Sequence, residues 1–408
     1  MKEYLRVAGK TIGREYPVFI IAEAGVNHEG DLAHAKRLVD AAVAAGADAV
    51  KFQTFSAERS VAKDARMAQY QKENLASDQS QFDLLKGLEL AESAHFELAK
   101  YCAGKGIIFL STPHSNRWSV DLLERVGVPA YKTGSGDLTN IPFLGYLASR
   151  RKPCFVATGM ASLAECYEAL GVFRGAKADD IVLLHCTTNY PTPLEDVNLL
   201  AMRSLERNCG VLVGYSDHTE GILVPALAAH MGAVVIEKHF TLDRSIARPK
   251  SPDHMCSLEP DELVRMVKVV RAMESLRSHP AEEALSLINE SLRIDVVAEQ
   301  RRSWTLSIAG FDYSKVSLLD SGRMISLIQG DGVKRPNANE ILMASSVRKS
   351  VIARRPLQAG RPIGEDDIDV LRPEGGYHPR YFDEILDHGI LIKDVASGEP
   401  LNPSNCVF

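Results

Sequence analysis

Short runs of apolar residues alternate with longer amphipathic stretches between about residues 17 and 275. The runs have the length of buried strands, and the stretches between them carry apolar residues at helical spacing. Several of these expected helices end in glycine, which is a common helix stop. Regular alternation of strand and helix predicts a parallel sheet covered by helices. The eight strand-like runs are VFIIAEAG, AVKFQTF, IIFLSTP, AYKTGSGD, CFVATGM, IVLLHCTT, VLVGYSD and VVIEKHF.

Eight units over about 250 residues have the size and number expected of a (β/α)8 TIM barrel. A doubly wound open sheet is the rival interpretation, but that fold does not require eight units of such even spacing. We therefore predict a TIM-barrel domain over residues 1–275. Active sites of TIM barrels lie at the carboxyl ends of the strands, so the residues at these ends decide the chemistry.

The remainder of the chain does not continue this pattern. Residues 276–344 are interpreted as an atypical insertion and linker, either an inserted subdomain or an ordered arm. Within them, SHPAEEALSLINESLRI predicts a helix, WTLSIAGFDYSKVSLLDSGRMISLI predicts short strands and turns, and GDGVKRPNANE predicts a polar linker. Residues 345–408 predict a compact unit of short strands and turns. This unit is too small to bury a large core alone, so we expect it to dock onto another surface.

Composition narrows the class of partner. The chain has 408 residues, 45% of them hydrophobic and 25% charged, with a net charge of −6 and no long basic block. Nucleic acid and anionic membranes are therefore not expected as partners, and no uncharged run approaches the length of a membrane span. The N-terminus lacks the apolar core of a signal peptide. Seven scattered cysteines without CxxC spacing predict reduced thiols in a cytoplasmic protein.

Polar residues end nearly every expected strand, although the apolar halves of the same strands carry almost no charge. One polar strand end is expected by chance, whereas convergence from all eight strands indicates an active site. These residues are Glu23, Asn27 and His28; Lys51 and Gln53; Ser111 and Thr112; Lys132, Ser135 and Asp137; Thr158; Thr187 and Thr188; Ser216, Asp217 and His218; and Glu237 and His239.

Two histidines end successive strands with acidic residues beside them. His218 follows GYSD, and His239 follows VVIEK, so both are expected to face the same barrel mouth. Neutral imidazole is a common metal ligand, and two imidazoles with carboxylate or water ligands suit Mn²⁺, Fe²⁺ or Zn²⁺. The alternative is a pair of histidines hydrogen-bonded to loop backbone, because no HxH or HExxH motif supports the metal.

Charged residues also occur inside the apolar runs. Lys51 and Lys132 lie near strand ends, where an inward ammonium group requires an anion. Lys132 precedes a TGSG turn whose amides could bind phosphate or carboxylate oxygens. A Schiff base and a buried ion pair with Glu23 or Asp137 are the alternatives. Glu23 is a candidate general base or an acceptor for sugar hydroxyls.

Seven stretches resemble, in order and spacing, the sialic acid synthases and the related enzymes that make legionaminic and pseudaminic acids. They are IAEAGVNHEG, AVKFQTF, FLSTP, YKTGSGD, LLHCTTNYPTP, GYSDHT and EKHFTLD. The tail VRKSVIARRPLQAGRPIGEDDIDVLRPEGG is similar to the antifreeze-like (SAF) domain of that family. The likeness covers nearly the whole chain and departs from it at residues 276–330, where about fifty extra residues intervene.

The resemblance implies a reaction and a set of ligands. Phosphoenolpyruvate would condense with an N-acyl-hexosamine aldehyde and water to give a nine-carbon 2-keto sugar acid and phosphate. A divalent metal, usually Mn²⁺ or Mg²⁺, would be held by His218 and His239 and would polarise the aldehyde oxygen. Phosphoenolpyruvate would be held by Lys51, Thr112, Lys132, Ser135 and Ser216. The sugar would be engaged by Glu23, Gln53, Asn74 and Tyr190.

The resemblance also implies catalytic carboxylates and a contribution from the tail. Asp137 and Glu237 occupy positions of carboxylates near the reacting centre, and with Glu23 and His239 they are the expected catalytic residues. Thr188 stands where some members have Asn, and it can still donate to an oxyanion. Arg372 matches an arginine that crosses from a partner subunit to the acyl group of the sugar, which implies a domain-swapped homodimer.

Two other functions are considered. Other phosphoenolpyruvate-dependent aldol synthases need a basic pocket for a phosphorylated acceptor and lack an SAF tail. A non-catalytic sugar-binding protein would have lost at least one strand-end residue, whereas Glu23, Lys51, Lys132, His218 and His239 are all present. The sequence does not identify the acceptor sugar.

Overall fold

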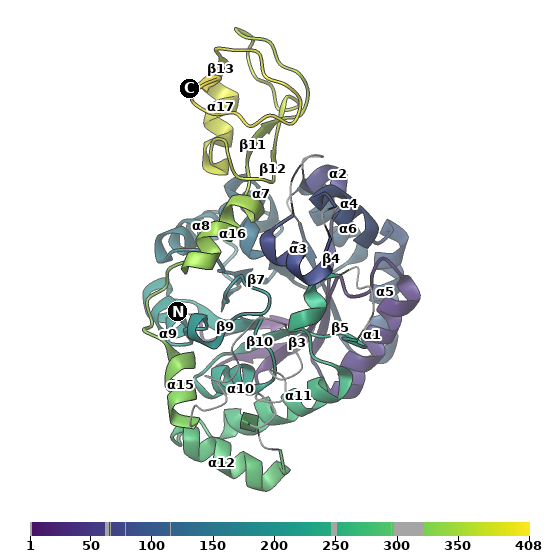
Figure 1. Cartoon of the computed structure of the whole chain (residues 1–408), viewed down its shortest axis with the longest axis vertical. Helices are drawn as coiled ribbons and strands as arrows, with labels where there is room; N and C mark the ends of the chain where they lie inside the picture. Colours follow the sequence, from purple (N-terminus) through teal and green to yellow (C-terminus); the bar gives the residue numbers. More distant parts are fainter. Residues whose placement is uncertain are drawn as a thin grey trace.

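The computed structural model describes residues 2–61, 65, 67–77, 79–114, 116–245, 251–294, 296–297 and 321–408. Its central sheet consists of the parallel strands β3 (Phe19–Gly25), β4 (Ala49–Thr54), β5 (Ile108–Pro113), β6 (Tyr131–Thr133), β7 (Cys154–Ala157), β8 (Ile181–His185), β9 (Leu212–Asp217) and β10 (Val235–His239). They pair in the order β5-β4-β3-β10-β9-β8-β7-β6. The end strands β5 and β6 contact each other, so the sheet curls into a nearly closed barrel (Figure 1). The TIM-barrel prediction is confirmed.

Alternation along the strands decides which side chains reach the pocket, because every second residue points into the barrel. In β3, Phe19 and Ile21 belong to the apolar cluster inside the barrel, and Glu23 follows at the same spacing. In β4, Ala49 is followed in the same way by Lys51. The barrel is therefore apolar in its lower layers and polar at the carboxyl ends of the strands. The same step leads from Leu110 to Thr112, from Ala130 to Lys132 and from Val235 to Glu237, and two such steps lead from Leu212 to Ser216.

A hairpin that the sequence did not predict precedes the barrel. Strands β1 (Tyr4–Val7) and β2 (Lys10–Gly13) pair antiparallel. Their Leu5, Val7 and Ile12 share an apolar cluster with residues that begin the barrel strands. The hairpin therefore closes the amino end of the barrel and leaves the carboxyl end for the site.

Helices cover the outside of the barrel and bury one face each in the main core. They are α1 (Leu32–Ala45), α5 (Glu92–Lys105), α6 (Arg117–Val126), α7 (Ile141–Ala148), α8 (Leu163–Gly175), α9 (Ala201–Cys209), α10 (Leu223–His230) and α11 (Pro260–Ser275). Helices α1 and α5 end as predicted, at Gly46 and Gly106, whose φ angles of 78° and 76° lie in the left-handed region.

The connection from β4 to α5 is longer than the others and lies beside the barrel mouth. It contains α2 (Ala57–Ser60), α3 (Gln69–Leu75) and α4 (Gln81–Leu88). Val26, Phe55, Met67, Leu84 and Leu88 form a small apolar cluster there, separate from the main core. This cluster gives the mouth one apolar side.

Helices occur within the described part of residues 276–330, ahead of the predicted polar linker. Helix α12 (Ala281–Leu292) confirms the helix predicted for the stretch SHPAEEALSLINESLRI. Short strands and turns were the wrong prediction for the end of the stretch WTLSIAGFDYSKVSLLDSGRMISLI, which forms helix α15 (Ser321–Gln329). Met324, Ile325 and Ile328 occur at helical spacing and are buried in the main core, which explains the helix. The rest of the predicted strand-and-turn segment, residues 304–320, lies outside the described residues.

The C-terminal tail projects from the carboxyl end of the barrel (Figure 1). It contains β11 (Ser350–Ala353), β12 (Ile368–Leu371), α17 (Phe382–His388), β13 (Ile390–Leu391) and β14 (Cys406–Val407), with a small apolar core of its own. Helix α16 (Ala338–Val347) precedes it, where the sequence predicted linker. Asn337 and Glu340 cap this helix reciprocally, a start signal that the sequence reading missed.

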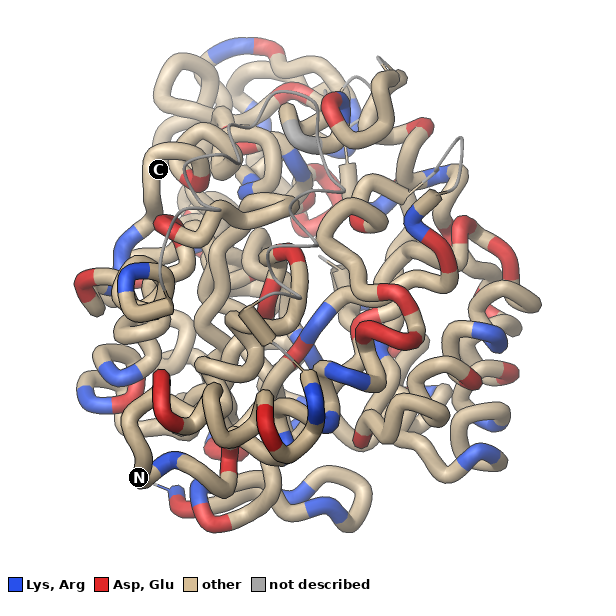
Figure 2. The backbone as a smooth tube through the Cα atoms, turned by 60° about the horizontal axis from the view of Figure 1, so that its bottom comes forward, with Lys and Arg blue, Asp and Glu red and all other residues tan. Residues whose placement is uncertain are grey.

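Charge is distributed without a dominant sign. In the view of Figure 2, acidic and basic residues alternate around the molecule. Among the described residues, no helix combines the length and the apolar character that a bilayer span requires.

Candidate active site

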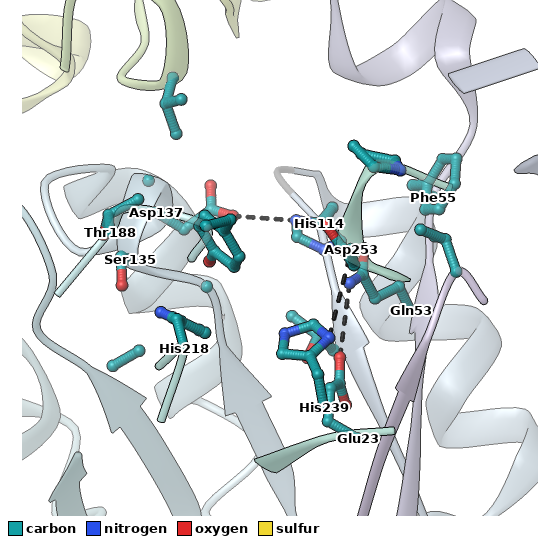
Figure 3. A pocket seen from close by; sticks show the side chains of 18 of the residues that line it. Glu23, Gln53, Phe55, His114, Ser135, Asp137, Thr188, His218, His239 and Asp253 are labelled. Atoms are coloured by element: carbon teal, nitrogen blue, oxygen red, sulfur yellow. Dashed lines mark hydrogen bonds and ion pairs between the residues drawn. The ribbon is translucent and has the colours of Figure 1, made fainter. Parts of the chain in front are cut away.

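A pocket at the carboxyl ends of the strands brings together the predicted site residues, with Asn74 as the exception (Figure 3). The predicted residues that line it are Glu23, Lys51, Gln53, Thr112, Lys132, Ser135, Asp137, Thr188, Tyr190, Ser216, His218, Glu237, His239 and Arg372. Because the barrel turns alternate residues of every strand inward, residues more than two hundred positions apart in the sequence meet here.

Two lysines and two glutamates form the floor of the pocket. Lys51 Nζ lies 2.6 Å from Glu23 Oε2 and 3.8 Å from Glu237 Oε2. Lys132 Nζ lies 3.2 Å from Glu237 Oε1, and that oxygen also accepts a hydrogen bond of 2.9 Å from Ser216 Oγ. The four charged side chains are at most 6% exposed. The floor is therefore an alternating cation–carboxylate network that an incoming anion can enter.

The two glutamates titrate in opposite directions. Burial raises the pKa of Glu23 to about 7, although the nearby Lys51 ammonium opposes this shift. Burial acts on Glu237 in the same way, but Lys132 and Lys51 outweigh it and lower the pKa of Glu237 to about 2. Glu23 is therefore the carboxyl group that can gain or lose a proton near neutral pH, and Glu237 stays ionised.

His218 and His239 lie beside this network as neutral imidazoles. Their ring centroids are 5.5 Å apart. Burial lowers the pKa of His218 to about 4 and that of His239 well below its usual value. His218 Nδ1 lies 2.7 Å from the carbonyl oxygen of Thr187, to which it must donate. The proton is therefore on Nδ1, and Nε2 of His218 keeps its lone pair.

The histidine pair fits a divalent metal, with open positions. Nδ1 of His239 is buried without a hydrogen-bond partner, and it lies 3.9 Å from Asp253 Oδ2. Burial raises the pKa of Asp253 to about 7. The described residues contain no group of three His, Cys, Asp or Glu side chains already arranged around a metal. Two imidazoles would therefore supply part of a coordination sphere, and substrate or water oxygens would supply the rest.

Ser135 and Thr188 form a hydroxyl-lined corner around Gly159. The amide of Gly159 donates to Ser135 Oγ at 3.1 Å. A Cβ atom at Gly159 would lie 2.0 Å from Thr188 Oγ1 and 2.7 Å from Ser135 Oγ. Gly159 therefore permits the two hydroxyl groups to approach each other. Thr188 Oγ1 is buried without a partner, so it can donate to an oxygen of a ligand.

Asn74 does not line the pocket. Its side-chain amide donates to the carbonyl oxygens of Tyr190 (3.1 Å) and Pro252 (2.8 Å). It therefore ties together two loops whose residues line the pocket. A direct contact between Asn74 and a sugar stays a prediction. The ring of Tyr190 packs against His218, with 4.1 Å between the centroids.

The opposite side of the pocket is apolar and was missed by the sequence reading. Val26, Phe55, Leu84, Leu85 and Leu88 line it. Most of these residues come from the helices between β4 and α5, and not from the carboxyl ends of strands, where the sequence analysis looked for site residues. The helical spacing of apolar residues within α4 is the signal in the sequence that could have indicated them.

The tail and the preceding helix α16 complete the pocket, together with a histidine that the sequence did not predict. Arg372, Met343 and Val347 line the pocket within the same chain. The backbone at Arg372 pairs with that at Val61, beside α2. His114, which follows the STP motif, also lines the pocket. One chain thus supplies Arg372 to its own barrel, and the predicted domain-swapped dimer stays a prediction.

A (β/α)8 barrel with paired ammonium groups, a titratable carboxyl group and two neutral imidazoles at its carboxyl end belongs to the barrel enzymes, and its pocket suits a small anionic substrate. Comparison with known proteins then gives the family. Residues 38–281 match the NeuB family, and residues 348–405 match the SAF domain. The chain therefore belongs to the NeuB family and carries a C-terminal SAF domain, which confirms the resemblance found in the sequence.

Similar proteins cover nearly the whole chain. It is 39% identical over 381 residues to the N,N'-diacetyllegionaminic acid synthase of Legionella pneumophila. The aligned residues make up 92% of this chain and 91% of that protein. It is 32% identical over 390 residues to a pseudaminic acid synthase of Campylobacter jejuni, with 94% and 95% covered. The crystal structure of the spore coat polysaccharide biosynthesis protein SpsE of Bacillus subtilis superposes on this chain with a TM-score of 0.76. The two sequences are 30% identical, and the superposition covers 99% of each chain.

Proposed function

We propose that this chain condenses phosphoenolpyruvate with the open-chain aldehyde of an N-acyl-hexosamine and with water, giving a 2-keto nonulosonic acid and phosphate. The observation that carries the proposal is the buried network of Lys51, Lys132, Glu23 and Glu237 beside two neutral histidines. The names of similar proteins, which are synthases of nonulosonic acids, agree with it.

The lysines are suited to the phosphate and the carboxylate of phosphoenolpyruvate. Lys51 Nζ already donates to Thr112 Oγ1 at 2.9 Å, so a ligand oxygen at this position would meet both an ammonium and a hydroxyl group. Burial tends to lower the pKa of Lys132, but Glu237 outweighs this effect and raises it, so Lys132 remains charged. Ser135, which follows β6, and Ser216, in β9, add hydroxyl donors to the pocket.

Glu23 is suited to the proton that the reaction requires. A ligand anion beside Lys51 would weaken the attraction that keeps Glu23 ionised, so binding favours the protonated carboxyl group. C3 of phosphoenolpyruvate then forms a bond to the aldehyde carbon, and Glu23 gives its proton to the aldehyde oxygen, which becomes a hydroxyl group. Water adds at C2 and gives one proton back to the Glu23 carboxylate. The new C2 hydroxyl group then becomes the keto group as the bond between C2 and the phosphate oxygen breaks, and its proton leaves with the phosphate.

His218 and His239 are proposed to hold the divalent ion, Mn²⁺ or Mg²⁺. The resemblance found in the sequence implies such an ion, and Nδ1 of His239 is buried without a hydrogen-bond partner. When bound, such an ion supplies Lewis acidity toward an oxygen of the substrate. His239 thus has a binding role as well as the catalytic role proposed from the sequence, and Glu237 is proposed to hold Lys132 and Lys51 in place.

The acceptor is proposed to meet the apolar side of the pocket. Phe55, Leu84 and Leu88 can bury acyl methyl or deoxy methyl groups, whereas these described side chains offer no positive charge to a phosphate group. Gln53, whose amide lies 3.4 Å from Glu23 Oε1, and Tyr190 are placed to contact sugar hydroxyl groups. This arrangement disfavours synthases that use phosphorylated acceptors.

The test is release of phosphate from phosphoenolpyruvate in the presence of Mn²⁺, across a panel that includes N-acetylmannosamine, diacetamido-trideoxyhexoses and a phosphorylated hexosamine. We expect release with an unphosphorylated N-acyl sugar and its loss in the His218→Ala variant. Release with only the phosphorylated sugar would favour another aldol synthase. Acceptor binding without release would favour a non-catalytic sugar-binding protein.

The organisation of the protein is proposed from the same observations. We propose a barrel domain over residues 1–275, an insertion and linker over 276–344, and an SAF domain over 345–408. A domain-swapped homodimer is tested by mixing a His218→Ala chain with an Arg372→Ala chain: recovery of activity requires that tails cross between subunits. All seven cysteines are buried free thiols, which supports a reducing, cytoplasmic location.

A further inference from the structure

A second buried cation–carboxylate pair lies at the rim of the pocket and joins the tail to the barrel. Lys349, the residue before β11, forms an ion pair with Asp137, which ends the turn η1 (Ser135–Asp137). Each side chain is only 1% exposed. Exposed ion pairs contribute little to stability, whereas loss of one partner from a buried pair is costly. This contact is therefore a strong candidate for a functional link between tail and barrel.

The same turn touches the tail at a second point. Gly136 lies against the end of α16, where a Cβ atom would come within 2.8 Å of Val347 Cγ1 and 3.0 Å of Val347 O. A larger residue at position 136 would push the tail away from the turn. Tail and turn are thus fitted to each other over consecutive residues, through Gly136 and Asp137.

The turn is also short and internally bonded. The amide of Asp137 donates to Gly134 O at 3.0 Å, and the amide of Leu138 donates to Ser135 O at 3.3 Å. Ser135 therefore moves with Asp137, because both belong to one turn of 3-10 helix. Any contact that fixes the carboxylate of Asp137 also fixes the hydroxyl group of Ser135 in the pocket.

We propose that Lys349 is a positioning residue, through which the docked tail holds Asp137 and so keeps the turn that presents Ser135 to phosphoenolpyruvate in place. The inference rests on the proposed function and extends it, because it gives the tail a role at the phosphoenolpyruvate end of the pocket. Asp137 then anchors the tail and does not transfer protons, which replaces the catalytic role expected from the sequence.

The surroundings of Asp137 agree with an anchoring role. Burial would raise its pKa, but Lys349 and His114 outweigh this effect and hold it well below the usual value. His114 Nδ1 lies 3.7 Å from Asp137 Oδ2. A carboxylate that stays ionised near neutral pH, with an ammonium group against it, is poorly suited to exchange protons with a substrate.

The inference does not depend on which subunit supplies the tail. Domain swapping exchanges an identical element between two copies. The exchanged element then makes the same contacts with either barrel. Lys349 would therefore meet Asp137 of its own barrel in a monomer and of the other barrel in a swapped dimer.

Four variants test the proposal. Lys349→Met removes the charge and keeps most of the side-chain length, Asp137→Asn removes the partner charge, and the double variant removes both. Arg348→Met is the matched control, because Arg348 joins the tail to Glu165 at 2.8 Å and to Met160 O without touching the turn. All four are compared with the parent chain in kcat and in KM for each substrate.

We expect Lys349→Met to raise KM for phosphoenolpyruvate by about 10- to 100-fold, as loss of a supporting contact typically does, and to change KM for the acceptor much less. The control should keep KM for phosphoenolpyruvate near the parent value. The double variant should recover part of the loss, because no unpaired charge stays buried. If Asp137→Asn and the double variant are both inactive while Lys349→Met resembles the parent, Asp137 is catalytic and the proposal is overturned.

Hydrogen exchange gives a readout without substrate. The amides of Asp137 and Leu138 should exchange faster in Lys349→Met than in Arg348→Met. Equal exchange in both variants would overturn the positioning role. If the proposed reaction itself is wrong, the parent chain releases no phosphate, but the amides of the turn still exchange faster in Lys349→Met than in Arg348→Met. Should Lys349→Met fail to fold, Gly136→Ala, which keeps both charges, should show the same rise in KM for phosphoenolpyruvate.

Discussion

Replacing the two glutamates of the pocket floor should change the stability of the protein in opposite directions. Glu23→Gln and Glu237→Gln each substitute a neutral isostere for a buried carboxylate. The pKa of Glu23 is raised from 4.5 to about 7, which corresponds to about 3 kcal/mol against its ionised form in the folded protein. The pKa of Glu237 is lowered from 4.5 to about 2, which corresponds to about 3 kcal/mol in favour of its ionised form.

The sign of each effect depends on pH. Between about pH 4.5 and 7 the folded protein holds a proton on Glu23 that the unfolded chain has lost, so Glu23 costs stability as the pH rises through this window. Glu23→Gln should therefore raise the free energy of unfolding by about 3 kcal/mol at pH 8 and change it little at pH 4. Glu237 stabilises the fold above pH 4.5, so Glu237→Gln should lower the free energy of unfolding by about 3 kcal/mol at pH 7.

The assay is urea denaturation followed by circular dichroism, from pH 4 to pH 8.5. Glu283→Gln, on the exposed face of α12, controls for the general effect of this substitution. The reasoning is refuted if Glu23→Gln destabilises the protein at pH 8, or if its effect does not change with pH. A stable but inactive Glu23→Gln variant would show that the proposed proton donor is kept at a cost in stability.

Further predictions concern the remaining parts of the pocket. The kcat/KM for phosphoenolpyruvate should fall as the pH rises through about 7, where Glu23 loses its proton, and a kcat/KM that does not change between pH 6 and 8 would argue against Glu23 as the proton donor. Gly159→Ala should raise KM for phosphoenolpyruvate by about a hundredfold with the fold intact, because the new methyl group displaces Ser135 and Thr188; an unchanged KM would exclude this corner as a ligand site. His218→Ala should weaken Mn²⁺ binding in calorimetry at least about tenfold, whereas retained affinity would place the metal elsewhere. Leu88→Asn should lower activity most with acceptors that carry methyl groups, and an equal loss with all acceptors would argue against an apolar acceptor side.

The barrel and its polar rim could be predicted because both follow from local periodicity. Alternation along β3 and β4 places Glu23 and Lys51 in one layer whatever the rest of the chain does. An ion pair of Lys51 with Glu23 is one of the alternatives that the sequence leaves open, and the structure contains it at 2.6 Å. The further partner Glu237 could not be predicted, because only the barrel brings it within 3.8 Å of Lys51. Pairing across a barrel depends on strand register, which a single sequence does not encode locally.

Residues that contact the barrel mouth from outside the strand ends were missed for a different reason. Glu340 lies in the segment GDGVKRPNANE, for which the sequence predicts a polar linker. Its carboxylate nevertheless accepts hydrogen bonds from the backbone amides of Met160 (2.8 Å) and Thr188 (2.9 Å). Its capping box with Asn337 was visible as a local pattern, but the contact with the barrel mouth is not local. Likewise, the apolar spacing of α15 suits a strand or a helix over so few residues, and packing against the barrel decides between them.

The electrostatics of the floor explain why the site can receive a strongly charged substrate although the chain carries a net negative charge. With Glu237 ionised and Glu23 protonated, Lys51 and Lys132 leave one positive charge in a layer that is nearly closed to solvent. Interactions between charges in such surroundings are much stronger than at the surface. An anion that enters is therefore attracted, and its arrival keeps Glu23 protonated until the aldehyde oxygen takes the proton. Substrate binding and proton supply are thus coupled through a single carboxyl group, which is why the pH at which Glu23 titrates should change when phosphoenolpyruvate is bound.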